Sequence, residues 1–146
     1  MIDAQWTGWS TIQDLSFVRS DGAAAGTVLS STPENFEDSW KIAVGFNYRL
    51  GGGWMLRGGA AYDQSPVQTL FRTPRLPDSY RTWLTAGGQY KFGNGLTLDF
   101  GAAYVWVAGG DINKNGDPPS TAANGLLNGR YSSNTVILSG QLSYEF

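Results

Sequence analysis

The sequence predicts an all-β fold, an antiparallel transmembrane β-barrel segment of about six strands. Three observations predict it. Apolar residues alternate with polar or small ones along most of the chain, with little sign of the 3.6-residue helical period. The links between the alternating runs are alternately long and short, as in membrane barrels. Aromatic residues gather near the ends of the runs, on the apolar side, as in the aromatic girdles of such barrels.

Six alternating runs are expected as strands. They span residues 3–19, 40–50, 54–63, 81–92, 96–107 and 135–146. The first run (DAQWTGWSTIQDLSFVR) is the least regular. The second is the clearest, because Trp40 and every second residue after it are apolar, whereas the intervening residues are charged, polar or small. In the third run, Trp54 and Tyr62 share the apolar side, and Arg57 and Asp63 lie opposite.

The last three runs repeat this pattern. In residues 81–92, Leu84 and Tyr90 oppose Arg81 and Gln89. In residues 96–107, every even-numbered residue is apolar, from Leu96 to Trp106. Residues 135–146 place Val136 and its apolar neighbours opposite Ser139 and other polar residues. A period of two places these residues on the two faces of extended strands.

The connections fall into two classes. The sequences GGG (residues 51–53) and GNG (residues 93–95) are expected as tight hairpin turns, because glycine and asparagine accept positive φ angles. The other links, residues 20–39, 64–80 and 108–134, are long and rich in Ser, Asn, Asp, Pro and Gly. This asymmetry predicts short periplasmic turns and long extracellular loops.

The composition narrows the possible functions. The chain of 146 residues has 10 basic and 12 acidic residues and a net charge of −2, so no nucleic-acid partner is expected. It has no cysteine, which excludes disulfides and zinc–thiolate sites. It has no histidine, the commonest general base and metal ligand. We therefore expect neither an enzyme nor a cofactor.

The distribution of large residues indicates which face meets lipid. Large side chains lie on the apolar face, the opposite face is rich in Gly, Ala and Ser, and only 15% of residues are charged. The apolar face is therefore expected to contact lipid and the polar face to line a lumen. The alternative is a soluble antiparallel sandwich or a lipocalin-like barrel with its apolar face inward.

A sheet of about six strands leaves two edges that lipid cannot satisfy. The chain is therefore expected to be a piece of a larger barrel, or to close a barrel with further copies of itself. Its first residues, MIDAQWTGWS, carry no secretion signal, which favours the first possibility.

Candidate ligand contacts lie on the expected lumen face. Lys41, Arg57 and Arg81 are candidates for binding a substrate carboxylate. Trp83 and Met55 interrupt the polar pattern of that face and would suit an apolar ligand. The alternative is a ladder of compensating charges that keeps the lumen hydrated.

Two motifs lie in the long links. The segment SPVQTLFRTPRLPD (residues 65–78) supplies the loop binding candidates Leu70, Phe71, Arg72 and Arg75, unless the loop folds onto its neighbours. The segment DINKNG, from Asp111, matches the first half of an EF-hand loop. The bidentate glutamate of that motif falls on an alanine, so no metal site is expected.

The order of motifs in two segments is more specific than alternation alone. The segment WMLRGGAAYDQSPV is followed by PDSYRTWLTAGGQY, and ENFEDSWKIAVG and GLTLDFGAAYVW flank them. In this order they resemble the outer-membrane long-chain fatty acid transport family, which includes aromatic-hydrocarbon uptake proteins. The resemblance covers essentially all of residues 1–146 and corresponds to the C-terminal part of the family's barrel.

The resemblance implies an outer-membrane location and passive uptake of hydrophobic compounds, either long-chain fatty acids or aromatic hydrocarbons. It implies that the family's N-terminal hatch and earlier strands are absent from these residues. The expected partners are outer-membrane lipid and lipopolysaccharide, a hydrophobic small molecule, and the barrel assembly machinery, which would read the last strand ending at Phe146. A structural or adhesive barrel module that closes by oligomerisation is the alternative.

Overall fold

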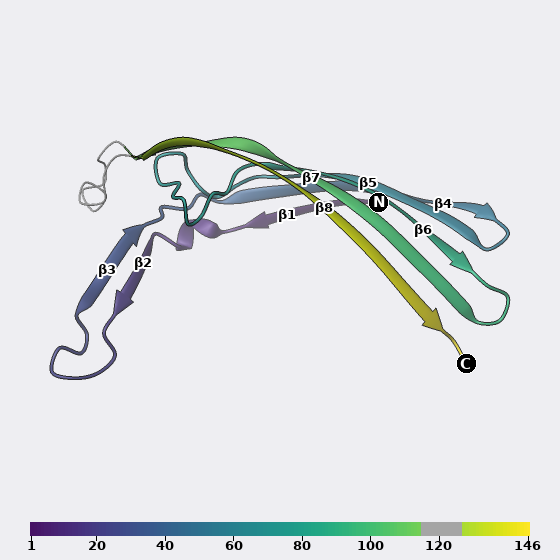
Figure 1. The fold of residues 1–146 in the computed structure, drawn as a ribbon, viewed down its shortest axis with the longest axis horizontal. Coiled ribbons are helices and arrows are strands. Elements are labelled where there is room, and N and C mark those ends of the chain that lie inside the picture. The colour runs from purple at the N-terminus through teal and green to yellow at the C-terminus, as the bar shows by residue number, and fades with distance from the viewer. Residues whose placement is uncertain (115–126) are drawn as a thin grey trace.

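The structure, a computed structural model, describes residues 1–114 and 127–146 (Figure 1). The elements in chain order are β1 (Ile2–Thr7), the 3-10 turn η1 (Trp9–Thr11), β2 (Asp14–Val18), β3 (Val28–Pro33), β4 (Ser39–Gly51), β5 (Trp54–Asp63), β6 (Arg81–Lys91), β7 (Leu96–Lys114) and β8 (Leu127–Tyr144). Among the described residues, no helix has the length and apolar character needed to span a membrane.

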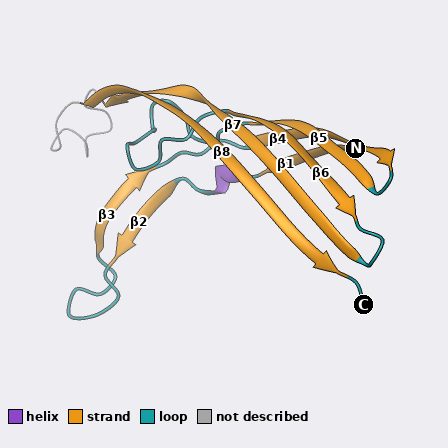
Figure 2. Ribbon diagram, turned by 45° about the vertical axis from the view of Figure 1, so that its right-hand side comes forward, coloured by secondary structure: helices purple, strands orange, loops and turns teal. Residues whose placement is uncertain are grey.

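Six of these strands form one open sheet in the order β1-β4-β5-β6-β7-β8. Every neighbouring pair is antiparallel. The sheet is strongly twisted and arched, and β2 and β3 form a separate hairpin that extends away from one end of it (Figures 1 and 2). The predicted all-β antiparallel fold with about six strands is confirmed.

The strand register gives the sheet two chemically different faces. Ile42 lies opposite Tyr62, which lies opposite Thr82 and then Trp106. We call the face of these even-numbered residues the outer face; it comprises the even positions in 2–6, 40–50, 54–62, 82–90, 96–106 and 134–144. The inner face comprises the odd positions of the same strands, in 3–7, 41–49, 55–63, 81–91, 97–107 and 133–143.

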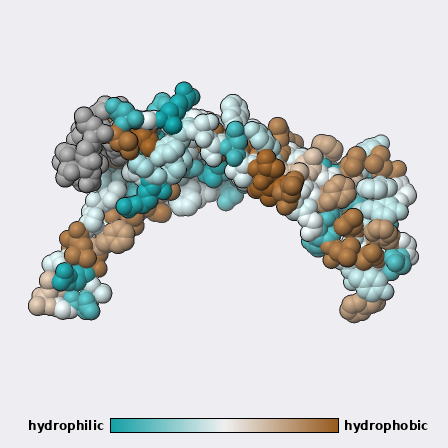
Figure 3. Space-filling view, in the orientation of Figure 1, coloured by the Kyte–Doolittle hydropathy of each residue, from teal (hydrophilic) through white to brown (hydrophobic). Residues whose placement is uncertain are grey.

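Large apolar side chains of the outer face are exposed. Phe46 is 62% exposed and Leu138 is 77% exposed. The buried hydrophobic residues of the described part of the chain are Val67, Val105 and Ile112, and none of them lies on the outer face. Figure 3 shows apolar residues over the strands, interspersed with polar ones. A soluble sheet would bury its apolar face in a core, whereas a membrane strand presents it to lipid.

Aromatic rings form clusters at both ends of the outer face. Where the hairpin turns lie, which we call the turn end, the ring of Tyr90 is 4.7 Å from those of both Trp54 and Phe92. At the opposite end, the loop end, Tyr62 stacks on Tyr80 at 6.1 Å. The rise of a strand puts Trp40 and Tyr48 roughly 26 Å apart along β4. That length is of the order of the apolar band of a membrane barrel, about 25 Å.

The tight turns and one long link occur as expected. Gly53 (φ 86°) and Gly95 (φ 85°) end the two short turns in the left-handed region. A Cβ at Gly53 would lie 2.5 Å from the Lys91 carbonyl oxygen, so the neighbouring hairpin also requires glycine there. Residues 64–80 form a long connection that contains a single bridge, Thr73 to Leu76.

The expectation for residues 3–39 was wrong in two respects. The first run is not one strand, because Gly8 and η1 interrupt it between β1 and β2. The link over residues 20–39 contains β3, which pairs with β2. β3 (VLSSTP) shows no clear alternation, so its pairing with β2 rather than its local pattern defines this hairpin.

The link over residues 108–134 was also predicted too long. β7 continues to Lys114 and β8 begins at Leu127, with the pairing resumed after a register shift between Val107 and Gly110. The glycines and asparagine of this segment suggested a loop. Gly109 instead permits close packing, since a Cβ there would meet the Arg130 side chain at 2.6 Å.

Candidate functional site

Two cavities lie on the inner face. The larger, the central hollow, has a volume of about 1100 Å³ and is lined mainly by the middle of β4–β8. The smaller, the loop-end pocket, has a volume of about 630 Å³ and is lined by the end of β1, the start of β4, the end of β5, the start of β6 and the segments adjoining these strand ends. Lys41 is the one described residue that lines both cavities.

Small residues on neighbouring strands form much of the central hollow. Gly45 pairs with Gly59, and Gly87 pairs with Gly101. A Cβ at Gly87 would lie 2.7 Å from the Phe100 carbonyl oxygen. Because these positions carry no side chain, they leave space for the hollow and allow the neighbouring backbones to approach closely.

The loop-end pocket is amphipathic. One side is apolar, with Trp9 and Phe36 in edge-to-face contact at 6.4 Å and with the buried Val67. The other side is polar and carries charged groups from three strands and one loop. Its charged residues are Lys41, Asp63, Asp78 and Arg81. Such a pocket can hold a molecule with an apolar body and a polar or ionised end.

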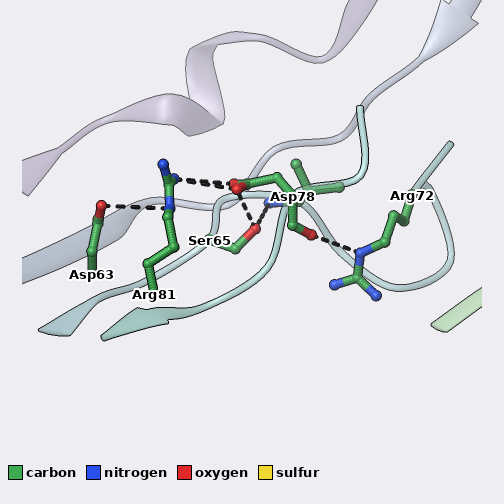
Figure 4. Close-up of polar contacts among 6 residues, drawn as sticks. Asp63, Ser65, Arg72, Asp78 and Arg81 are labelled. Atoms are coloured by element: carbon green, nitrogen blue, oxygen red, sulfur yellow. Dashed lines mark hydrogen bonds and ion pairs between the residues drawn. The ribbon is translucent and has the colours of Figure 1, made fainter. Parts of the chain in front are cut away.

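A charged network holds the polar side of this pocket (Figure 4). Arg81 lies between two carboxylates: its Nε is 3.6 Å from Asp63 Oδ2 and its Nη2 is 3.3 Å from Asp78 Oδ1. The Ser65 hydroxyl donates to Asp78 Oδ2 at 2.9 Å. All three charged side chains are 19–34% exposed, so they are partly shielded from water. The network fixes the start of β6 to the loop before it.

Arg72 anchors the loop to β7 and is itself buried, at 5% exposure. Its Nε donates to the Asp78 carbonyl at 2.8 Å, and its Nη1 donates to the Asp111 carbonyl at 3.0 Å (Figure 4 draws the first). A Cβ at Gly110 would lie 3.2 Å from this guanidinium, so glycine makes room for it. Arg72 therefore positions the loop and does not present its charge to either cavity.

A second ion pair lies on the inner face nearer the turn end. Arg57 Nη1 donates to Asp99 Oδ1 at 2.9 Å, and Gln89 Nε2 donates to the same oxygen at 2.8 Å. The Arg57 side chain is 43% exposed. This pair matches the compensating-charge alternative, and the open surroundings reduce its contribution to stability.

The Lys41 ammonium has an aromatic partner. Its Nζ lies 5.4 Å from the centre of the Trp83 ring, within the range of a cation–π interaction. Asp63 lies directly opposite Lys41 in the register, yet its carboxylate pairs with Arg81. Among the described residues, no carboxylate lies within 4 Å of Lys41.

The structure brings together some of the candidates named from the sequence. Lys41, Arg57 and Trp83 line the central hollow, and Arg81 lines the loop-end pocket. Met55 lies on the inner face opposite Gln89 but lines neither cavity.

The loop candidates lie apart from both cavities. Neither cavity is lined by Leu70, Phe71 or Arg75, and Leu70 is 57% exposed. Sequence reasoning missed Trp9 and Phe36, which precede and follow the β2–β3 hairpin and meet only in the folded chain.

No metal site is found among the described residues: they contain no group of three or more acidic side chains that could hold an ion. Asp111, the first residue of the EF-hand-like motif, is 3.8 Å from Arg130. The last two residues of that segment, Asn115 and Gly116, lie outside the described residues.

Comparisons with known proteins agree with the family resemblance noted in the sequence. A family model described as outer membrane protein transport protein (OMPP1/FadL/TodX) matches residues 1–146. The long-chain fatty acid transport protein of Escherichia coli K12 is 34% identical over 112 residues, covering 71% of this chain and 24% of that protein. The 47 kDa outer membrane protein of Pasteurella multocida is 32% identical over 125 residues, covering 86% of this chain and 28% of that protein.

A solved structure is also similar. The crystal structure of a Pseudomonas aeruginosa FadL homologue matches with a TM-score of 0.86 and 30% identity, over 98% of this chain and 31% of that one. The chain thus spans about a quarter to a third of the length of these relatives. The predicted resemblance to the C-terminal part of this family's barrel and the predicted outer-membrane location are confirmed.

Proposed function

This chain belongs to the family of outer membrane transport proteins, and from that membership we propose that it forms part of the wall and ligand path of a channel for hydrophobic compounds. Transport in this proposal is passive and involves no catalytic step. The ligand enters from the loop end, binds in the loop-end pocket and continues into the central hollow. The relatives named for long-chain fatty acid transport support this ligand class.

One observation carries the proposal most directly. The amphipathic loop-end pocket and the central hollow are both lined by Lys41 on the inner face. They are therefore adjacent along one side of the sheet. The pocket supplies Trp9, Phe36 and Val67 for an apolar body. Its charged side supplies groups for a polar end. Binding sites for amphipathic molecules combine these two features.

The sheet edges define what the rest of the channel must provide. β1 and β8 each have one edge without a partner among the described residues. Backbone groups at such edges cannot stay unpaired in lipid, so further strands complete the barrel in this proposal. The β8 strand, followed by the exposed aromatic Phe146, is proposed to be the element that the barrel assembly machinery engages.

A pair of tryptophan substitutions tests the proposed path. Thr85→Trp places a large ring in the central hollow, whereas Leu84→Trp places one on the lipid-facing side of the same strand. We expect Thr85→Trp to lower uptake of a labelled long-chain fatty acid several-fold and Leu84→Trp to leave it unchanged. Heat-modifiable mobility of the two variants in gels controls for folding. Equal uptake by Thr85→Trp and the unmodified protein would contradict the proposed path.

A further inference from the structure

The inner face contains three cations at its two cavities, and they differ in how their charges are compensated. Arg81 has Asp63 and Asp78 as partners. Arg57 has Asp99. Lys41 has no carboxylate within 4 Å among the described residues, and its ammonium rests over the Trp83 ring. Lys41 is therefore the cation of this set that is free to accept an anionic partner.

Lys41 lies where the two cavities meet. It is half-buried on β4 and is the one described residue that lines both the loop-end pocket and the central hollow. A molecule moving between the two cavities along the inner face passes this side chain. A cation–π contact is a weaker restraint than a charge-assisted hydrogen bond, so an anion can replace the ring as the partner of the ammonium.

The neighbouring charges make anion binding at the loop-end pocket depend on Lys41. Asp63, Asp78 and Arg81 together carry one net negative charge at the pocket. With Lys41 the four groups sum to zero, and without it the pocket repels an anion. The long, flexible lysine stem also lets the charge follow a ligand over a short distance, which the planar and paired guanidinium of Arg81 does not.

We infer that Lys41 selects ligands by charge: it binds the anionic head group of an amphiphile at the junction of the two cavities and transfers it from the loop-end pocket into the central hollow. Trp83 holds the ammonium in place when no ligand is bound. The inference rests on the proposed transport function and narrows its ligands to molecules with one anionic end and an apolar body. Neutral hydrocarbons gain nothing from Lys41.

The test uses two ligands with the same hydrocarbon chain and different head groups: oleate ends in an anionic carboxylate and oleyl alcohol in a neutral hydroxyl. Binding of each is measured by competition with a fluorescent fatty acid analogue, using the purified full-length protein in detergent above neutral pH. Three variants are compared with the unmodified protein: Lys41→Met, Lys41→Arg and Lys91→Met. Lys91 is a matched control, because it is also on the inner face but lines neither cavity.

We expect Lys41→Met to bind oleate about ten-fold more weakly and oleyl alcohol with unchanged affinity, since it loses one charge-assisted contact. Lys41→Arg retains oleate binding, and Lys91→Met matches the unmodified protein for both ligands. Unchanged oleate binding by Lys41→Met, or an equal loss of both ligands, would overturn the inference. If the unmodified protein binds neither ligand, the proposed function itself is wrong.

Discussion

The two faces of the six-stranded sheet are built from the same strands, one residue apart, and they differ in nearly every property. The outer face carries large apolar side chains that stay exposed and aromatic rings at both ends. The inner face carries glycines, alanines and paired charges around two cavities. The alternation therefore gives the sheet one face suited to lipid and one face that, in the proposed function, lines a polar path.

Glycine has a different function on each face. On the outer face, the rings of Phe46 and Phe100 cover Gly58 and Gly88 on the neighbouring strands, where a Cβ would lie 2.8 Å and 2.6 Å from them. On the inner face, Gly87 faces backbone and not a side chain. The outer glycines are thus sites for aromatic packing, and the inner ones leave space for the central hollow.

The largest difference between the faces is expected for a buried charge. Ala86→Arg puts a guanidinium on the outer face. Ala103→Arg puts the same group on the inner face of the adjacent strand, next to Ala102, the register partner of Ala86. We expect Ala86→Arg to lower the free energy of unfolding by about 2–4 kcal/mol, because a charge near the bilayer midplane is costly. Ala103→Arg should cost less than about 1 kcal/mol. Urea unfolding in lipid vesicles measures both, and similar losses would contradict the assignment of the faces.

A smaller difference is expected for adding one methyl group to each face. In Gly87→Ala the new Cβ meets the Phe100 carbonyl oxygen at 2.7 Å, and the backbone cannot move aside without disturbing the strand pair. In Gly88→Ala it meets the Phe100 ring at 2.6 Å, and the ring can rotate. We expect Gly87→Ala to destabilise the protein by about 1–3 kcal/mol and Gly88→Ala by less.

The same unfolding assay provides the control for these glycines. No atom of the described residues lies within 4 Å of a Cβ added at Gly140, so Gly140→Ala should leave the stability nearly unchanged. A loss for Gly140→Ala equal to that for Gly87→Ala would show that the measured effect comes from backbone flexibility rather than from crowding.

The smallest effect is expected outside the membrane band, where water is available. The backbone N–H of Ser10 donates to Asp38 Oδ1 at 2.8 Å and, as the main cause, lowers the pKa of Asp38 below its ordinary value of 3.8. Because the pKa is lower in the folded state, the stabilisation is present above pH 3.8 and is lost as the pH falls through the folded value.

Hydrogen exchange at Ser10 as a function of pH measures this contact. In the unmodified protein, protection of the Ser10 amide, corrected for the intrinsic exchange rate, should decline only below about pH 4. Asp38→Asn removes the ionisable group, so its protection should have no such acid-dependent step. A step that persists in Asp38→Asn would assign the acid sensitivity to another group.

The regular strands could be predicted from the sequence because their function requires strict alternation. β5 begins and ends as expected, β4 is one residue longer than expected at each end, and β6 ends one residue earlier than expected. Lipid on one side and a lumen on the other impose a period of two on every residue between the girdles. Beyond the loop end this constraint disappears, so the β2–β3 hairpin and the extensions of β7 and β8 were missed.

The site was predicted only in part for a similar reason. The period of two placed Lys41, Arg57, Arg81 and Trp83 on one face. It could not show that Arg81 pairs with carboxylates whereas Lys41, among the described residues, contacts the Trp83 ring instead, because pairing depends on side-chain direction across strands. Arg72 was an expected loop contact, yet it is buried and fixes the loop, since its partners are backbone carbonyls distant in sequence.

The central claim, that odd positions face a polar path and even positions face lipid, is tested most directly by cysteine labelling. The chain has no cysteine of its own, so single substitutions are unambiguous. We would label Leu84→Cys, Thr85→Cys, Ala102→Cys and Ala103→Cys in intact outer membranes with a water-soluble maleimide. The account predicts labelling of Thr85→Cys and Ala103→Cys alone, with oleate protecting both. Labelling of Leu84→Cys and Ala102→Cys instead would contradict it.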